Sequence, residues 1–78
     1  MKIGMLWFDN DPKATMDQKI QKAVDYYKDV RGMVATTCYV HPSMTEGQPE
    51  TDGKIVLAKV EVRTSRSIMP NHFWIGVD

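Results

Sequence analysis

The chain has little that would suit it to a membrane, a disulfide-stabilised fold or a polyanion. Its one cysteine, Cys38, cannot form an internal disulfide, which is typical of a reducing, cytoplasmic compartment. No stretch approaches the ~20 apolar residues of a membrane-spanning helix, and the run Ile3–Phe8 is too short for a signal peptide. Ten basic residues balance ten acidic ones, so net charge favours no charged partner. We therefore expect a soluble, cytoplasmic protein of one domain, residues 1–78.

An amphipathic helix between Thr15 and Gly32 is the clearest element that the sequence does contain. Thr15 and Gln18 form a capping-box pattern at its start, and Gly32 is a typical residue for its C-terminal end. The apolar residues in between recur at spacings of three and four, which places them on one stripe: Met16, Ile20, Ala23, Val24, Tyr27 and Val30. This stripe needs an apolar partner, and strands can supply it.

Four segments have strand-like sequence: Ile3–Phe8, Met33–Val40, Ile55–Arg63 and His72–Val77. The continuous apolar run Ile3–Phe8 predicts a strand buried on both faces. Short links around the helix favour a parallel first pair of strands, and the polar loop Ser43–Gly53 lets the third strand return antiparallel to the second. The sequence thus predicts an α+β fold of order β-α-β-β-β, with a mixed four-stranded sheet and one helix packed on one face.

One helix covers only one face of such a sheet, so the other face needs a different partner. In Ile55–Arg63 the alternation of side chains places Val56 and Val60 on the helix side. The opposite face then exposes apolar side chains that we expect to form an interface: Trp7, Ile55, Leu57 and Trp74. A homodimer is the expected result, because small domains often compensate for a small core by associating. Docking of another protein is the alternative.

Polar residues follow the first two strands and form a candidate metal or acid–base site. Asp9 and Asp11 follow the first strand, and His41 follows the second. If those strands are parallel, the three side chains lie at one edge of the sheet, where two carboxylates and an imidazole could hold a divalent metal. A carboxylate could instead orient His41 as a general base. Turn formation and helix capping explain the same residues without any chemistry.

Basic and aromatic residues gather where the third strand leads into the fourth, at the expected opposite end of the sheet. Arg63 and Arg66 leave the third strand, while His72 and Trp74 belong to the fourth. Such side chains can contact phosphates and stack on bases, so nucleic-acid binding is an alternative function. Two arginines are few for this purpose, and Glu61 is placed to neutralise Arg63.

Cys38 is the one candidate nucleophile, but its position favours a structural role. Cys38 alternates with Thr36 and Val40 on one face of the second strand, whereas His41, three residues on, points to the other face. A free cysteine on such a face usually packs as a small apolar side chain. The sequence predicts no catalytic residue and no cofactor.

A resemblance to known proteins is carried by two segments, His41-Pro42-Ser43 and Pro70–Val77, and by the opening strand, the Asp-Asn-Asp-Pro turn and the helix. In these parts the chain is similar to small uncharacterised bacterial proteins, some of them carried on mobile elements. The similarity spans most of the chain. It implies a small cytoplasmic protein and brings no activity, cofactor or site residue with it. The sequence therefore favours a non-enzymatic accessory or interaction module that self-associates, with nucleic-acid binding and a metal-assisted or acid–base activity as alternatives.

Overall fold

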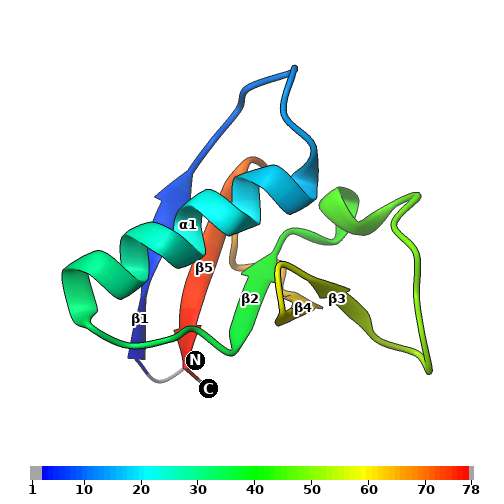
Figure 1. The fold of residues 1–78 in the computed structure, drawn as a ribbon. Helices are drawn as coiled ribbons and strands as arrows, with labels where there is room; N and C mark the ends of the chain where they lie inside the picture. The colour runs from blue at the N-terminus through cyan, green and yellow to red at the C-terminus, as the bar shows by residue number, and fades with distance from the viewer. Residues whose placement is uncertain (1–2, 78) are drawn as a thin grey trace.

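The computed structural model describes residues 3–77, which form one α-helix and a mixed five-stranded sheet (Figure 1). The elements in chain order are β1 (Ile3–Phe8), α1 (Met16–Arg31), β2 (Thr37–Val40), the short 3-10 helix η1 (Pro42–Thr45), β3 (Ile55–Leu57), β4 (Val60–Thr64) and β5 (His72–Val77). The strand order across the sheet is β1-β5-β2-β4-β3. The predicted α+β class with a single α-helix is confirmed. No helix in the described part of the chain is both long and apolar enough to span a membrane.

Both ends of α1 are fixed by the residues that the sequence indicates. The Thr15 hydroxyl accepts a hydrogen bond from the Gln18 backbone N–H, and the Gln18 side chain accepts one from the Thr15 N–H, which completes the capping box. Gly32 ends the helix with a left-handed backbone, at φ 68°, and donates its N–H to the Lys28 carbonyl. These local hydrogen bonds explain why the helix bounds are readable from sequence.

The sheet topology differs from the prediction because the last strand inserts into the centre. β5 lies between β1 and β2 and is antiparallel to both, so β1 and β2 run in the same direction without pairing. β4 pairs with β2 in parallel, not in the antiparallel arrangement predicted for the third strand. The predicted four-strand order is therefore wrong. Strand patterns indicate where strands form, whereas contacts between distant residues decide which of them become neighbours.

The predicted third strand, Ile55–Arg63, is a hairpin of β3 and β4 and not one strand. Leu57 pairs with Val60, and the two residues between them, Ala58 and Lys59, have φ values of 52° and 66°. Positive φ at both central residues is the mark of a type I′ turn, which usually contains Asn-Gly. Ala58-Lys59 lacks these residues, so the sequence does not predict that the chain reverses direction here. It also overturns the predicted faces, because Val56 is exposed whereas Ile55 is buried.

We expect the double substitution Ala58→Asn, Lys59→Gly to stabilise the protein. A left-handed backbone costs an ordinary L-residue roughly 1–2 kcal/mol, and asparagine and glycine reduce that cost. The expected gain of about 1 kcal/mol would raise the midpoint of thermal unfolding by about 4–8 °C. Thermal unfolding followed by circular dichroism measures it. An unchanged midpoint would argue against a two-residue turn at this point.

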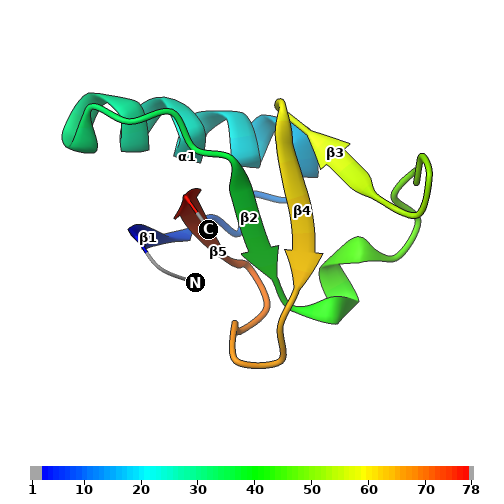
Figure 2. The same cartoon turned by 90° about the horizontal axis from the view of Figure 1, so that it is seen from below.

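The core lies between α1 and one face of the sheet, as Figure 2 shows with the helix as a separate layer above the strands. The helix packs against β5, β3 and β1. The side chains buried in this layer include Ile20, Ala23 and Tyr27 from the helix and Cys38, Val40, Val60, Val62, Phe73 and Ile75 from the strands. β1 is an edge strand in which no residue is buried, so its predicted burial on both faces is wrong. Its apolar sequence does not reveal that it pairs on one side only.

Candidate functional site: the sheet face opposite the helix

The sheet face that α1 leaves open, called the uncovered face below, is the candidate functional site. Residue pairing and strand alternation define it. Its larger side chains are Leu6 and Phe8 from β1, His72 and Trp74 from β5, Tyr39 from β2, Glu61 and Arg63 from β4, and Val56 from β3. Leu6, Phe8 and Val56 remain 59%, 56% and 58% exposed, which is unusual for large apolar side chains on one surface.

A row of cross-strand partners runs through the centre of this face. Leu6 pairs with Trp74, Trp74 with Tyr39, and Tyr39 with Arg63. The Tyr39 and Trp74 rings meet edge to face, with their centroids 5.6 Å apart. Two residues further along β1 and β5, the centroids of the Phe8 and His72 rings are 4.9 Å apart. These aromatic contacts hold the rings in fixed orientations and build a continuous apolar strip from β1 to β2.

Among residues 3–77, the charged side chains of the uncovered face lie on its β4 side, where their charges largely neutralise one another. Arg63 forms an ion pair with Glu61, and its Nη1 lies 3.5 Å from the Tyr39 hydroxyl oxygen. The Nζ of Lys54 lies 3.5 Å from the Oε1 of Glu61. Hydrogen bonds to Tyr39 and Glu61 raise the pKa of Arg63, while the bond to Arg63 lowers the pKa of Glu61. A groove of about 520 Å³ borders this end, lined by Tyr39, Arg63 and Glu50 among others. The face is therefore apolar at β1 and balanced in charge at β4.

Of the four residues predicted to form an interface on this face, only Trp74 lies on it. Trp7 points to the helix side, where its ring centroid lies 5.2 Å from that of Tyr26, and Ile55 and Leu57 pack into the core. The indole Nε1 of Trp7 is buried and has no hydrogen-bond partner within residues 3–77. Trp7 therefore serves as a partly buried core side chain in this chain. Whether the four residues contact another molecule stays a prediction.

Leu6 and Phe8 were missed because the sequence of β1 gives no clue to its two faces. The run Ile3–Phe8 is apolar at five of its positions and glycine at the sixth, so alternation cannot assign a side. Tyr39 was missed for a different reason: tyrosine is common in β-strands, so its presence in a strand-like segment does not indicate a functional role.

The residues of the predicted basic site are brought to one region of the uncovered face. Arg63, His72 and Trp74 lie on β4 and β5, and Arg66 follows in the connection between these strands. The predicted position at the opposite end of the sheet is wrong, because β4 runs parallel to β2. The Ser65 N–H donates to the Val40 carbonyl, and the Asp9 N–H donates to the Asn71 carbonyl. Both candidate sites therefore lie at the same end of the sheet.

Asp9, Asp11 and His41 satisfy hydrogen bonds within their own turns. The Asp9 carboxylate accepts from the Asp11 N–H at 3.0 Å, and the Asp11 carboxylate accepts from the Lys13 N–H at 2.9 Å. The Nδ1 of His41 accepts from the Ser43 N–H at 3.1 Å. β5 separates the ends of β1 and β2, and among residues 3–77 no three His, Cys, Asp or Glu side chains are grouped for a metal. The geometry thus gives the metal site no support.

We expect the Cys38 thiol to be unreactive in the native protein. Cys38 is fully buried under α1, and burial raises the pKa of its thiol to about 12. A colorimetric disulfide reagent at pH 8 should label it only after denaturant is added. The same shift makes the native state lose stability as the pH rises between about 9 and 12, because only the unfolded chain gives up the proton there. Rapid labelling without denaturant would show that the helix layer opens.

Comparisons with protein-family models, with curated proteins and with solved structures give no match for this chain. The geometry of the uncovered face is therefore the main indication of what this chain does.

Proposed function

We propose that this protein is a small, non-enzymatic interaction module that self-associates through apolar side chains of its uncovered face. One observation carries the proposal: Leu6 and Phe8 are more than half exposed beside Trp74, on the sheet face that α1 leaves open. Burying such side chains against a second copy gains about 25 cal/mol for each Å² of apolar surface removed from water. A chain of 78 residues has a small core, so this gain also supports its fold.

Light scattering coupled to size exclusion tests the proposal over a range of protein concentrations. We expect a mass of twice the 8.9 kDa of one chain. Leu6→Lys should shift the protein to the monomer, because a charged side chain would be buried among apolar ones. Val34→Lys is the matched control, since Val34 is 64% exposed in the link between α1 and β2. A wild-type monomer at every concentration would refute the proposal.

A second candidate function is binding of single-stranded nucleic acid by the same face. It is supported by the row in which Trp74, Tyr39 and Arg63 are neighbours, with His72 alongside and Arg66 in the following connection. Exposed aromatic rings can stack on bases, and arginines can contact phosphates. The ion pair of Arg63 with Glu61 and the balanced net charge count against it.

Fluorescence anisotropy with labelled single-stranded and duplex oligonucleotides at several salt concentrations tests this second function. Binding through this face should weaken with salt and should be lost in the double variant Arg63→Ala, Arg66→Ala. Lys28→Ala together with Arg31→Ala, at the far end of α1, removes the same amount of charge and is the control. Equal binding by both double variants would exclude the basic residues as the contact.

A further inference from the structure

β1 is a six-residue strand at the end of the sheet, and within residues 3–77 it pairs with β5 alone, so its other edge is free. The Asp9 N–H donates a hydrogen bond to the Asn71 carbonyl. In an antiparallel pair every second residue bonds to the neighbouring strand, so Trp7, Met5 and Ile3 are the residues of β1 that bond to β5. The backbone N–H and C=O groups of Gly4, Leu6 and Phe8 therefore point away from the sheet. Free strand edges are usually protected by charge, proline or a short length. Residues 3–8 contain neither a charged residue nor a proline.

The other edge of the sheet is much less suited to pairing. β3 has only three residues, and the preceding segment folds back on itself through a bridge between Thr51 and Lys54. Lys54 lies immediately before β3. Short length and charge are the features that discourage strand addition, so β1 is the edge where a further strand would pair.

Apolar side chains are exposed on both sides of the β1 edge. Leu6 and Phe8 lie on the uncovered face, while Ile3 on β1 and Tyr26 and Val30 on α1 lie on the helix side. Figures 1 and 2 both show the C-terminal end of α1 extending past β1. A strand added beside β1 would therefore lie under this end of the helix and would have apolar neighbours in both layers.

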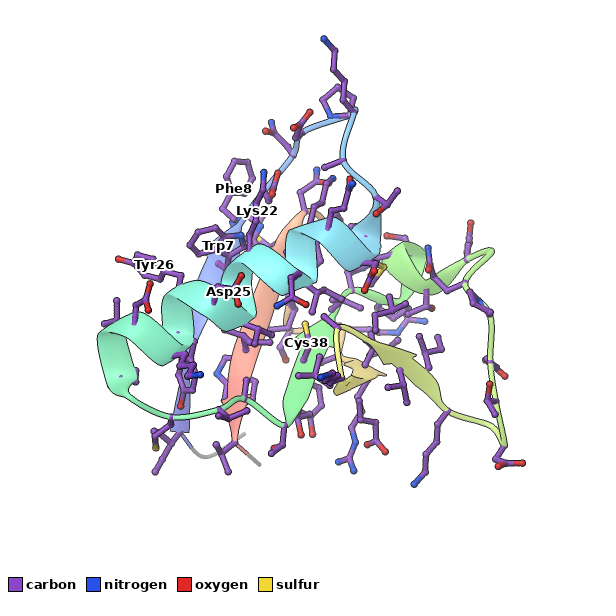
Figure 3. The ribbon with its side chains drawn as sticks, in the orientation of Figure 1. Trp7, Phe8, Lys22, Asp25, Tyr26 and Cys38 are labelled. Atoms are coloured by element: carbon purple, nitrogen blue, oxygen red, sulfur yellow. The ribbon has the colours of Figure 1, made fainter. Side chains whose placement is uncertain are left out.

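The helix surface beside this edge is complementary to itself. Lys22, Tyr26 and Asp29 are spaced by four and three residues and share one stripe of α1. Figure 3 shows Tyr26 projecting from the helix on the side of Trp7, with Lys22 on the same side of the helix. A two-fold axis at Tyr26 would set two such stripes antiparallel and bring Lys22 of each copy towards Asp29 of the other. A parallel arrangement would place like charges together.

The β1 strand and the α1 helix place this two-fold axis at the same point. Tyr26 lies against Trp7, so an axis at Tyr26 centres the antiparallel pairing of two β1 strands on Trp7. In this register Leu6 of one copy is opposite Phe8 of the other, and the outward N–H and C=O groups of both residues pair. The two large side chains that β1 exposes on the uncovered face would then contact each other across the seam.

We propose that a second copy of this chain binds at the β1 edge, by antiparallel β1–β1 pairing centred on Trp7 with the two α1 helices side by side over the seam. The result is a continuous ten-stranded sheet with a two-fold axis and a closed, isologous interface. This inference rests on the proposed self-association and specifies its geometry. It differs from stacking of two uncovered faces, in which the β1 edge stays free.

Two variants at one position test the backbone pairing by sedimentation equilibrium. Leu6→Pro removes an N–H that points away from β5 and places a ring on the free edge, so it leaves the β1–β5 hydrogen bonds intact. Leu6→Ala shortens the same side chain and keeps the N–H. We expect Leu6→Ala to weaken the dimer about 10-fold, by partial loss of an apolar contact, and Leu6→Pro to abolish it. Equal effects of the two variants would overturn edge pairing.

A charge exchange on α1 tests the same geometry without changing the strand, and circular dichroism checks that each variant is folded. Lys22→Glu alone and Asp29→Lys alone should each weaken the dimer, and the double variant should restore it. Asp17→Lys, in the exposed first turn of α1, is the control and should have no effect. If Leu6→Pro prevents folding, this exchange decides the question.

The outcomes separate this inference from the proposed function. A dimer that persists in Leu6→Pro and in Lys22→Glu but dissociates in Leu6→Lys would overturn edge pairing and leave association through the uncovered face standing. A wild-type protein that is monomeric throughout would refute both. Loss in Leu6→Pro with rescue by the double charge exchange is the result that we expect.

Discussion

Replacing Gly76 with alanine is expected to destabilise the protein by about 3 kcal/mol or more, a large part of the stability of a domain of this size. Gly76 on β5 pairs with Gly4 on β1. A Cβ added at Gly76 would lie 2.1 Å from the Ile3 carbonyl oxygen and 2.6 Å from the Gly4 Cα. Both are backbone atoms of a paired strand, so the clash can be relieved only by separating β1 from β5.

Alanine substitutions at two other glycines provide a comparison, with the free energy of unfolding of each variant measured in urea. Gly4→Ala should be less damaging, because the nearest atom to its added Cβ belongs to the Trp74 ring, although the Ile75 carbonyl is also close. Gly47→Ala meets nothing within 4 Å, but its φ of 77° makes it cost about 1 kcal/mol. If Gly76→Ala costs no more than Gly47→Ala, the β1–β5 register is incorrect.

Phe73→Ala and Trp74→Ala are expected to separate stability from association, although the residues are adjacent. Phe73 is fully buried beneath α1, so its truncation should cost about 3–5 kcal/mol and leave little folded protein. Trp74 lies partly exposed on the uncovered face, so its truncation should cost less stability and should act on self-association. Calorimetry measures the first effect, and light scattering measures the second.

The comparison within this pair tests which face of β5 is which. A variant Trp74→Ala that unfolds as readily as Phe73→Ala would mean that the uncovered face is already closed within one chain. Association unchanged in a folded Trp74→Ala variant would contradict a contact that includes Trp74, and would restrict the contact to β1 and the α1 residues Lys22, Tyr26 and Asp29. Phe73→Leu, which keeps an apolar side chain in the core, is the control for specific loss of volume.

Local signals explain how far the sequence predicts the fold. Thr15, Gln18 and Gly32 determine the bounds of α1 through hydrogen bonds within a few residues, and Ile3–Phe8 and His72–Val77 are strands with the bounds that their composition indicates. The β3–β4 reversal was missed because Ala58 and Lys59 adopt positive φ without the residues that favour it. Sequence alone cannot show strain that the rest of the sheet imposes.

The sequence by itself determined an α+β protein with one helix on one face of a sheet, because periodicity and caps are properties of neighbouring residues. Tertiary structure alone decided that β5 lies between β1 and β2, that β4 runs parallel to β2, and that Trp7, Ile55 and Leu57 face the helix. It also decided that Leu6 and Phe8 are the exposed apolar side chains beside a free strand edge. Strand pairing joins residues far apart in the chain, and the free energy of these contacts depends on the whole sheet.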